Sequence, residues 1–295
     1  MINTLDARTR TGPSASPRQR GRTWRRLVRR PSVLLAMAFL LLLCAVAVFG
    51  PLLMTHDPNQ QSLRESFGSI SAAHWLGTDD LGRDVYSRII VATRLTVIAP
   101  LIAVGVAVLI GLPTGLLAGY SGGWIDWALS RVADTLLSLP PIVLAVTIVA
   151  VIGPNLVNAM VGIGIVYAPR LFRVVRGSVL SVREELFVES ARSIGCSTSR
   201  TLFSHVLPNV STPLLVQVTL MMGFALLAEA SLSFLGLAVQ PPDASWGAML
   251  RTAYEHQFRA PYAVVAPGVL LTLTILSFNI VGDGIRDAVA GRRTR

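Results

Sequence analysis

The sequence predicts an all-α, polytopic membrane protein with six transmembrane helices. Hydrophobic residues make up 52% of the 295-residue chain, charged residues only 14%, and the mean hydropathy is +0.59. Soluble globular proteins carry about 25% charged residues. The apolar residues also form uninterrupted runs that are long enough to cross a bilayer core of roughly 30 Å.

The N-terminal part is expected to contain a disordered tail and the first span. Residues 1–30 hold nine arginines among Ser, Thr, Pro and Gly, so residues 1–31 are too polar to fold alone. Residues 32–53 are long enough to be the first span, and residues 32–94 combine this span with a polar loop. A cleaved signal peptide is the alternative, because residues 45–47 resemble a cleavage site, but the apolar run continues beyond them.

The polar loop ends in the segment WLGTDDLGRDVYSR, residues 75–88. Thr78 is expected to cap a helix that carries two acids in its first turn, where they favour the helix dipole. This spacing would form two i,i+4 ion pairs, Asp79–Arg83 and Asp84–Arg88. We therefore expect an interfacial helix that leads into the second span.

Five further spans are expected to form a core over residues 95–286. Four of them are expected at Leu95–Tyr120, Leu156–Phe172, Pro213–Leu237 and Tyr262–Val281. The remaining one, the third span of the chain, is expected to follow residues 131–134 and to end near Ile152. The third span is expected to be kinked at Pro140-Pro141. Arg131 and Asp134 are expected to pair with each other. Residues 282–287 are expected to close the last span, and residues 287–295 to form a short tail.

The polar segment 184–209 lies between the fourth and fifth spans. Its first part is expected to be a short helix with Phe187, Ala191 and Ile194 on one face. Gly195 is expected to end this helix with a positive φ. Ser197 is expected to cap a second short helix, which Pro208 stops or kinks. A rigid, bent segment between two spans is suited to hold another protein.

All 26 basic residues are arginines. Without a lysine the chain lacks the phosphate-binding residue of a P-loop and cannot be its own Walker-type ATPase. If the N-terminus is cytoplasmic, twenty arginines fall in cytoplasmic segments and six in outer ones, which predicts that both termini and the segment 184–209 are cytoplasmic. The same rule accounts for the net charge of +10 without nucleic-acid binding.

The segment 184–209 resembles the EAA loop of ABC importer permeases, which docks into a groove on the ATP-hydrolysing subunit. The match lies in Glu189-Ser190-Ala191, Gly195 and the sequence His-Val-Leu-Pro-Asn at 205–209, which is similar to the version in dipeptide, oligopeptide and nickel permeases. Ser190 and His205 replace the Ala and Ile of the general pattern. The residues that the resemblance implies in ATPase coupling are Glu189, Ser190, Ala191, Arg192, Gly195, His205, Leu207 and Pro208.

Two further stretches resemble the same family. Residues 77–88 resemble its GTDxxGRDxxSR signature, and residues 227–236 (LAEASLSFLG) resemble its fifth-span signature. The resemblance covers the chain from about Trp75 to its C-terminal end. The signature residues are Gly77, Thr78, Asp79, Gly82, Arg83, Asp84, Arg88, Asp283 and Gly284.

The resemblance implies the fold of a type I ABC importer permease and the import of dipeptides or oligopeptides across a bacterial inner membrane. It implies a second, similar permease, two ATP-binding subunits that hydrolyse ATP and an extracytoplasmic substrate-binding protein, together with membrane lipid; it implies no cofactor. Nickel or glutathione import stays open within the family. A stand-alone ion-coupled carrier is the alternative class, but it would have several buried charges and broken spans in matching halves.

Glu229 is the one acid well inside an expected span, which makes it a candidate for transport. We favour a structural role, in which it pairs with a serine or the backbone of a neighbouring helix. The histidines lie outside the spans and are scattered along the chain, so neither a catalytic site nor a metal site is expected. These residues are His56, His74, His205 and His256. Cys44 and Cys196 predict no disulfide framework.

Overall fold

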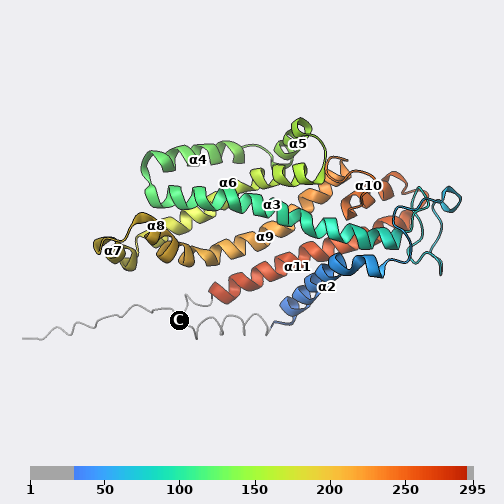
Figure 1. Ribbon diagram of the computed structural model, residues 1–295, viewed down its shortest axis with the longest axis horizontal. Helices are drawn as coiled ribbons and strands as arrows, with labels where there is room; N and C mark the ends of the chain where they lie inside the picture. Colours follow the sequence, from blue (N-terminus) through green and yellow to red (C-terminus); the bar gives the residue numbers. More distant parts are fainter. Residues whose placement is uncertain (1–29, 291–295) are drawn as a thin grey trace, which may run out of the picture.

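The computed structural model describes residues 30–290. The predicted tail 1–31 lies outside this range except for its last two residues, as do residues 291–295. All named elements within the range are helices, and the long ones run along a single elongated bundle (Figure 1). The prediction of an all-α chain is confirmed.

Five helices are long and apolar enough to span a membrane. Helix α2 matches the expected first span to within one residue. Each of the other four helices contains nearly all of an expected span and extends beyond at least one end of that span. The helices are α2 (Pro31–Leu53), α3 (Val85–Ser121), α6 (Leu156–Arg183), α9 (Leu207–Phe234) and α11 (Val265–Ala290). The prediction that residues 282–287 close the last span is wrong, because α11 continues through them to Ala290.

The expected third span is broken rather than kinked. Helix α4 (Gly123–Leu137) and helix α5 (Pro141–Ile152) meet at an angle of 92°, and they count as a sixth span only when taken together. Pro140 has an extended ψ of 124°, and the residue that follows it is also a proline. Two successive residues without an N–H group cannot continue the hydrogen bonds of α4, so the chain starts a new helix in another direction.

Short elements lie at the two ends of the bundle. They are η1 (Leu63–Glu65), α7 (Leu186–Ser193), α8 (Thr198–Thr201), the π-helix η2 (Leu202–Val206), α10 (Trp246–Glu255) and η3 (Pro261–Val264). Figure 1 shows α7 and α8 at one end, and α10 with the loop between α2 and α3 at the other. The segment 184–209 and the segment 75–88 are therefore separated by the length of the bundle.

Helices α3 and α6 form the most extensive pair in the bundle. Gly111, Gly115 and Gly119 lie one turn apart on the face of α3 that meets α6. A Cβ atom on Gly115 would lie 2.8 Å from Cβ of Val175 and 2.9 Å from the carbonyl oxygen of Phe172. The glycines thus let two helix backbones approach closely, as small residues do in membrane helix pairs.

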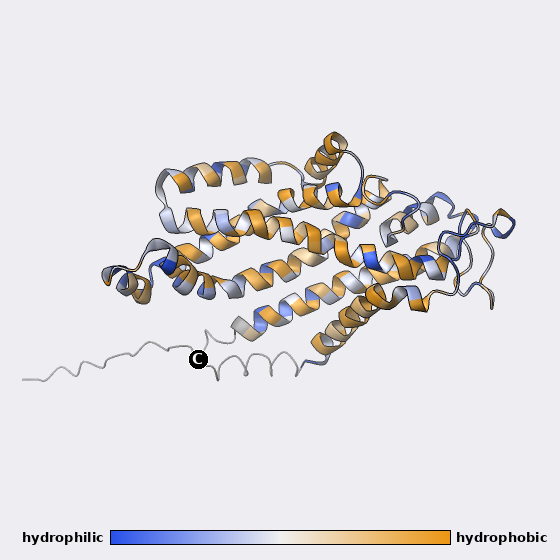
Figure 2. Cartoon of the chain, viewed as in Figure 1, coloured by the Kyte–Doolittle hydropathy of each residue, from blue (hydrophilic) through white to orange (hydrophobic). Residues whose placement is uncertain are grey.

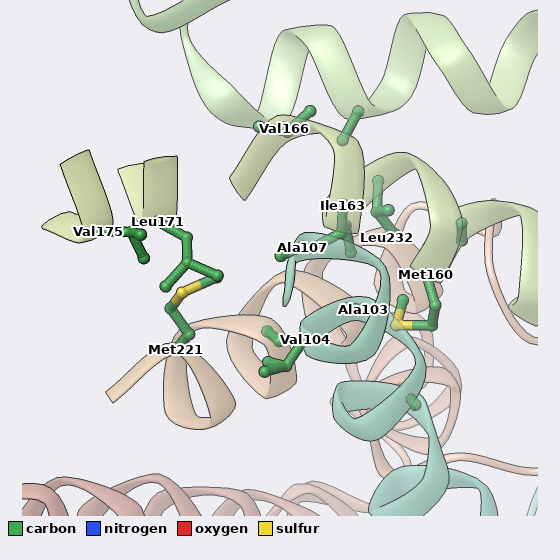
Figure 3. Close-up of a cluster of buried hydrophobic side chains, with 14 of the residues drawn as sticks. Ala103, Val104, Ala107, Met160, Ile163, Val166, Leu171, Val175, Met221 and Leu232 are labelled. Atoms are coloured by element: carbon green, nitrogen blue, oxygen red, sulfur yellow. The ribbon is translucent and has the colours of Figure 1, made fainter. Parts of the chain in front are cut away.

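Apolar side chains fill the centre of the bundle and also cover its outside. Figure 3 shows the central cluster, in which Met160, Ile163 and Met221 are fully buried. The hydropathy colouring in Figure 2 shows further apolar residues on the outer faces of the long helices, and Val151 is 83% exposed. Because soluble monomers rarely expose such extensive apolar surface, these faces are suited to contact lipid.

Candidate functional site

The segment 184–209 begins with helix α7, which ends at Gly195 as predicted. Gly195 has a φ of +81°, and its N–H group donates to the carbonyl of Arg192 at 2.9 Å. The N–H group of Cys196 donates to the carbonyl of Ala191 at 3.0 Å. These two bonds form a Schellman motif, which closes the C-terminus of the helix and fixes the direction in which the chain leaves it.

The second half of the segment differs from the prediction. Ser197 does cap α8, because its Oγ accepts from the N–H group of Arg200 at 3.4 Å. Pro208, however, does not stop this helix: α8, η2 and α9 follow one another without a break. A π-helical turn precedes the proline, with the N–H group of Leu207 donating to the carbonyl of Leu202. The wider turn changes the bonding pattern just before the residue that lacks an N–H group, so the helix can continue.

The buried and exposed residues of α7 also differ from the prediction. Val188 and Ala191 are buried, whereas Phe187 and Ile194 are exposed, so Phe187, Ala191 and Ile194 do not form one buried stripe. The exposed large apolar side chains of the segment 184–209 are Leu186 (78% exposed), Phe187, Ile194 (81% exposed) and Phe203. We call these four residues the apolar end patch.

Polar residues of α7 connect it to its surroundings. Nε of Arg192 donates to the hydroxyl oxygen of Tyr120 at 3.2 Å, which links α7 to the end of α3. Glu189 is exposed, and the hydroxyl of Ser190 donates to the carbonyl of Leu186 at 2.8 Å. His205 lies in the π-helical turn, and its carbonyl oxygen accepts from the side chain of Asn209 at 2.7 Å.

Ion pairs connect α4 to α6 near the end of the bundle that carries α7. Asp134 does not pair with Arg131, as the sequence suggested, but lies 2.6 Å from the guanidinium of Arg173. Arg131 instead lies over the ring of Trp127. Asp126 accepts two hydrogen bonds from Arg176, one of them at 2.7 Å. The partner of each acid is on another helix, so local spacing alone did not reveal it.

At the opposite end, residues 75–84 form a tight loop, and only residues 85–88 of the segment 75–88 belong to a helix. Thr78 caps no helix: its hydroxyl donates to the carbonyl of Glu65 and accepts from the N–H group of Gly68 at 2.7 Å. Helix α3 begins only at Val85, and Asp84 caps it by accepting from the N–H group of Ser87 at 2.8 Å.

The glycines and charges of this loop explain its shape. Gly77 and Gly82 have φ values of +74° and +72°, and a Cβ atom on Gly82 would lie 1.9 Å from the carbonyl oxygen of Ser62. Asp79 forms the predicted pair with Arg83, at 2.7 Å, although within a turn. The predicted Asp84–Arg88 pair is wrong, because Nε of Arg88 lies 3.6 Å from Asp79 instead.

Two histidines of the loop between α2 and α3 lie side by side, although they are distant in the sequence. The ring centroids of His56 and His74 are 4.8 Å apart, and Nδ1 of His74 lies 2.9 Å from Oδ1 of Asp84. The interpretation of all four histidines as scattered is therefore wrong for this pair. Burial opposes ionisation of Asp84, but the hydrogen bonds from His74 and Ser87 outweigh it and lower the pKa of this carboxyl.

Glu229 is fully buried in α9. Its Oε1 accepts from the hydroxyl of Ser233 at 2.7 Å, and Ser233 in turn accepts from the hydroxyl of Ser245 at 3.2 Å. Ser245 caps α10, so this chain of hydrogen bonds connects α9 to α10. Among the described residues, Oε2 of Glu229 has no hydrogen-bond partner.

A cavity of about 800 Å³ lies between α6, α9 and α11. Its wall combines apolar residues with guanidinium, amide and hydroxyl groups. The polar residues that line it are Arg173, Ser178, Ser181, Asn209, Thr212, Gln217 and Arg286. Such groups can bind carboxylates and peptide bonds.

Two family models match the chain. Residues 111–295 match the model described as binding-protein-dependent transport system inner membrane component. Residues 18–69 match the model described as the N-terminal TM domain of oligopeptide transport permease C. Together the two models cover the first span and the chain from the second half of α3 onward.

Curated relatives and a solved structure agree with these matches. The dipeptide transport system permease protein of Alkalihalophilus pseudofirmus is 43% identical over 83% of this chain and 80% of its own length. The glutathione transport system permease protein of Pectobacterium atrosepticum is 40% identical over 90% of this chain and 89% of its own. An inward-facing structure of the MetNI methionine ABC transporter has a similar fold, with a TM-score of 0.56 and 20% identity over 66% of this chain and 92% of the matched chain.

Proposed function

This chain belongs to the family of binding-protein-dependent transport system inner membrane components, and from this membership we propose that it imports short peptides as one permease subunit of an ABC importer. The bundle of five long helices and one broken span fits this family. The two relatives carry a dipeptide and glutathione in their names, and glutathione is itself a short peptide. Glutathione is therefore the second candidate substrate.

The cavity between α6, α9 and α11 supports a peptide substrate. Arg286 supplies a positive charge to its wall, Arg173 supplies a guanidinium that is paired with Asp134, and Gln217 supplies an amide. A peptide carries a carboxylate and several amide groups, which these side chains can bind. A cavity made of apolar surface with a few polar groups also accepts varied peptide side chains.

We assign ATP hydrolysis to partner subunits that dock on the segment 184–209. The observation that carries this proposal is the apolar end patch: Leu186 and Ile194 are about four-fifths exposed at the two ends of α7, at an end of the bundle that is rich in arginine. The chain has no lysine for a P-loop of its own. Glu189, Ser190 and Arg192 are exposed on the same helix and can bind polar groups at the edge of a partner's groove, while buried Ala191 lets α7 pack closely on the bundle.

The proposed assembly contains a second, similar permease, two ATP-binding subunits and a substrate-binding protein on the outer side. Both termini and the segment 184–209 face the cytoplasm in this proposal, and residues 54–84 face outward. The excess of arginines at one end supports this orientation. The proposed units are residues 1–31 and 287–295 as cytoplasmic tails, 32–94 as the first span with its outer loop, and 95–286 as the permease core.

In the proposed mechanism, ATP closes the two ATP-binding subunits and moves the docked α7 helices. The Schellman turn at Gly195 and the uninterrupted path from α8 into α9 transmit this movement as a rigid-body rotation. Helix α3 follows, because Arg192 contacts Tyr120 and α3 is packed closely on α6. The core switches between two packed arrangements, which alternates access to the cavity.

Reconstitution of the chain with its partner permease, ATP-binding subunits and binding protein tests the proposal. We expect ATP-dependent uptake of a radiolabelled alanine dipeptide into proteoliposomes. Competition by unlabelled glutathione would show whether the importer also accepts this second candidate substrate. An assembly that hydrolyses ATP but takes up neither compound would refute the peptide substrate. Failure of the ATP-binding subunits to bind this chain would refute the docking role as well.

A further inference from the structure

Three potential metal ligands come together at the end of the bundle opposite α7. His56 lies three residues after the end of α2, His74 belongs to the loop, and Asp84 directly precedes α3. One ligand atom from each residue lies within 4.8 Å of those from the other two. The side chain of Asp84 is 1% exposed, that of His74 is 16% exposed and that of His56 is 38% exposed, so the cluster has a buried carboxylate and one open side.

The surrounding bonds hold the carboxylate of Asp84 in place. Its Oδ2 accepts from the N–H group of Ser87 at 2.8 Å and from the hydroxyl of Thr55 at 3.4 Å. Its Oδ1 faces Nδ1 of His74 at 2.9 Å, and its Oδ2 lies 4.0 Å from Nδ1 of His56. One of the three ligands is therefore fixed before any ion binds.

These distances are close to those of a metal centre. Bonds of about 2.0–2.1 Å in tetrahedral geometry place neighbouring ligand atoms roughly 3.3–3.4 Å apart. Nδ1 of His74 is 2.9 Å from Oδ1 of Asp84 and Nδ1 of His56 is 4.0 Å from Oδ2, values on either side of this one, while one ligand atom from each residue lies within 4.8 Å of the other two. His56 follows the end of α2 and is partly exposed, so its ring can move toward Asp84 until the separation matches that of a metal centre.

The carboxylate of Glu65 lies on the opposite side of the His74 ring. When Nδ1 of His74 binds a metal, its proton must reside on Nε2, and Oε2 of Glu65 lies 3.9 Å from that atom. Metal-bound histidines almost always donate their other N–H group to a carboxylate, a carbonyl or water. Glu65 is placed to accept this hydrogen bond after a small movement.

We propose that His56, His74 and Asp84 bind a divalent transition-metal ion of the zinc or nickel class. Two imidazole nitrogens and one carboxylate oxygen suit such ions, and three protein ligands leave a position for water. The bound ion connects the end of α2, the loop and the start of α3, in addition to the packing of α2 on α3 and the hydrogen bonds from the N–H groups of Thr55 and His56 to the hydroxyl of Ser87. It therefore stabilises the end of the bundle that we propose to face outward.

Metal titration of the full-length chain in detergent tests this site. The protein should carry a tag without histidine and be treated with EDTA before use. We expect one Co²⁺ ion per chain, with the intense visible absorption of a four-coordinate ion, displacement by Zn²⁺ and a saturable rise in Tm with Zn²⁺. His56→Gln and His74→Gln should each weaken binding at least tenfold.

His256→Gln is the matched control. His256 belongs to the same end of the bundle, but its Nδ1 faces the carbonyl of Thr252 at 3.0 Å, outside the cluster. This variant should bind Co²⁺ as the wild-type protein does. If the wild-type protein binds no Co²⁺ or Zn²⁺, or if His56→Gln binds them as tightly as wild type, the cluster is only a hydrogen-bonded brace and the proposal is wrong. His56→Gln without metal should have the Tm of the metal-free wild type, which shows that the variant is folded.

Discussion

The guanidinium of Arg192 lies over the ring of Tyr120, with Cζ 4.7 Å from the ring centroid and Nε 3.2 Å from the hydroxyl oxygen. The two residues are 72 positions apart in the sequence. Tyr120 belongs to the last turn of α3, and Arg192 belongs to α7, so this contact connects the proposed docking helix directly to a membrane-spanning helix. It is a candidate route by which the movement of α7 reaches the core.

Tyr120→Leu should weaken the transmission of movement from α7. A cation–π contact at an exposed site contributes about 0.5–1 kcal/mol, which corresponds to a factor of roughly two to five. We expect the ratio of substrate-stimulated to basal ATP hydrolysis in the reconstituted importer to fall by about this factor. Tyr120→Phe keeps the ring and should lose less. Equal ratios for Tyr120→Leu and wild type would show that the contact is not part of the route.

Gly195→Val should prevent docking of the ATP-binding subunits without affecting membrane insertion. A Cβ atom at Gly195 would meet no neighbouring atom, so the cost comes only from the φ of +81°. A β-branched residue in this conformation costs on the order of 1–2 kcal/mol or more and redirects the chain after α7. Co-purification of the ATP-binding subunits measures the effect, which should be smaller for Gly195→Asn.

Gly105→Val is the control for this experiment. The position is equally open, but it lies within α3 and has no positive φ. This variant should retain the ATP-binding subunits. Normal co-purification with Gly195→Val would mean that the turn does not determine the docking geometry.

The local features of the chain could be predicted from the sequence. The limits of α2, the positive φ of Gly195 and the cap at Ser197 follow from neighbouring residues only, and the structure has all three. Apolar length also predicted the long helices, because every span must satisfy its backbone hydrogen bonds internally.

The errors concern residues whose environment comes from distant segments. Thr78 has the sequence context of a helix cap, but its contacts to Glu65 and Gly68 hold it in a loop. Asp134 has an arginine three positions away, yet α6 offers Arg173 in a better position. The inward face of α7 could not be predicted either, because it depends on which helices surround it.

Gly115→Val should destabilise the fold itself. The new Cβ would lie 2.8 Å from Cβ of Val175 and 2.9 Å from a carbonyl oxygen of α6, so the two helices would have to separate. Overpacking of this kind costs typically 1–3 kcal/mol. We expect a lower Tm in detergent and less monodisperse protein than for Gly105→Val, which adds the same side chain to the same helix in open space. Similar Tm values for the two variants would contradict close packing of α3 on α6.

Single cysteines test the proposed orientation. Ser69 and Ser199 are exposed at opposite ends of the bundle, and Cys44 and Cys196 form no disulfide. In a background with Cys44 and Cys196 replaced by alanine, Ser69→Cys should react with a membrane-impermeant maleimide in intact cells. Ser199→Cys should react only after the cells are opened. Labelling of Ser199→Cys but not of Ser69→Cys in intact cells would reverse the orientation.

Glu229→Gln should preserve folding and most of the uptake activity. The Oε1 atom of glutamine can still accept from the hydroxyl of Ser233, which keeps the connection through Ser245 to α10. Glu229→Leu removes this acceptor and leaves the buried Ser233 hydroxyl to find another partner, at a cost of about 1–3 kcal/mol. The leucine variant should therefore have a lower Tm, and both variants should be compared by Tm and by peptide uptake in proteoliposomes. If Glu229→Gln assembles normally and hydrolyses ATP but no longer transports peptide, the carboxylate itself takes part in transport and the structural role is wrong.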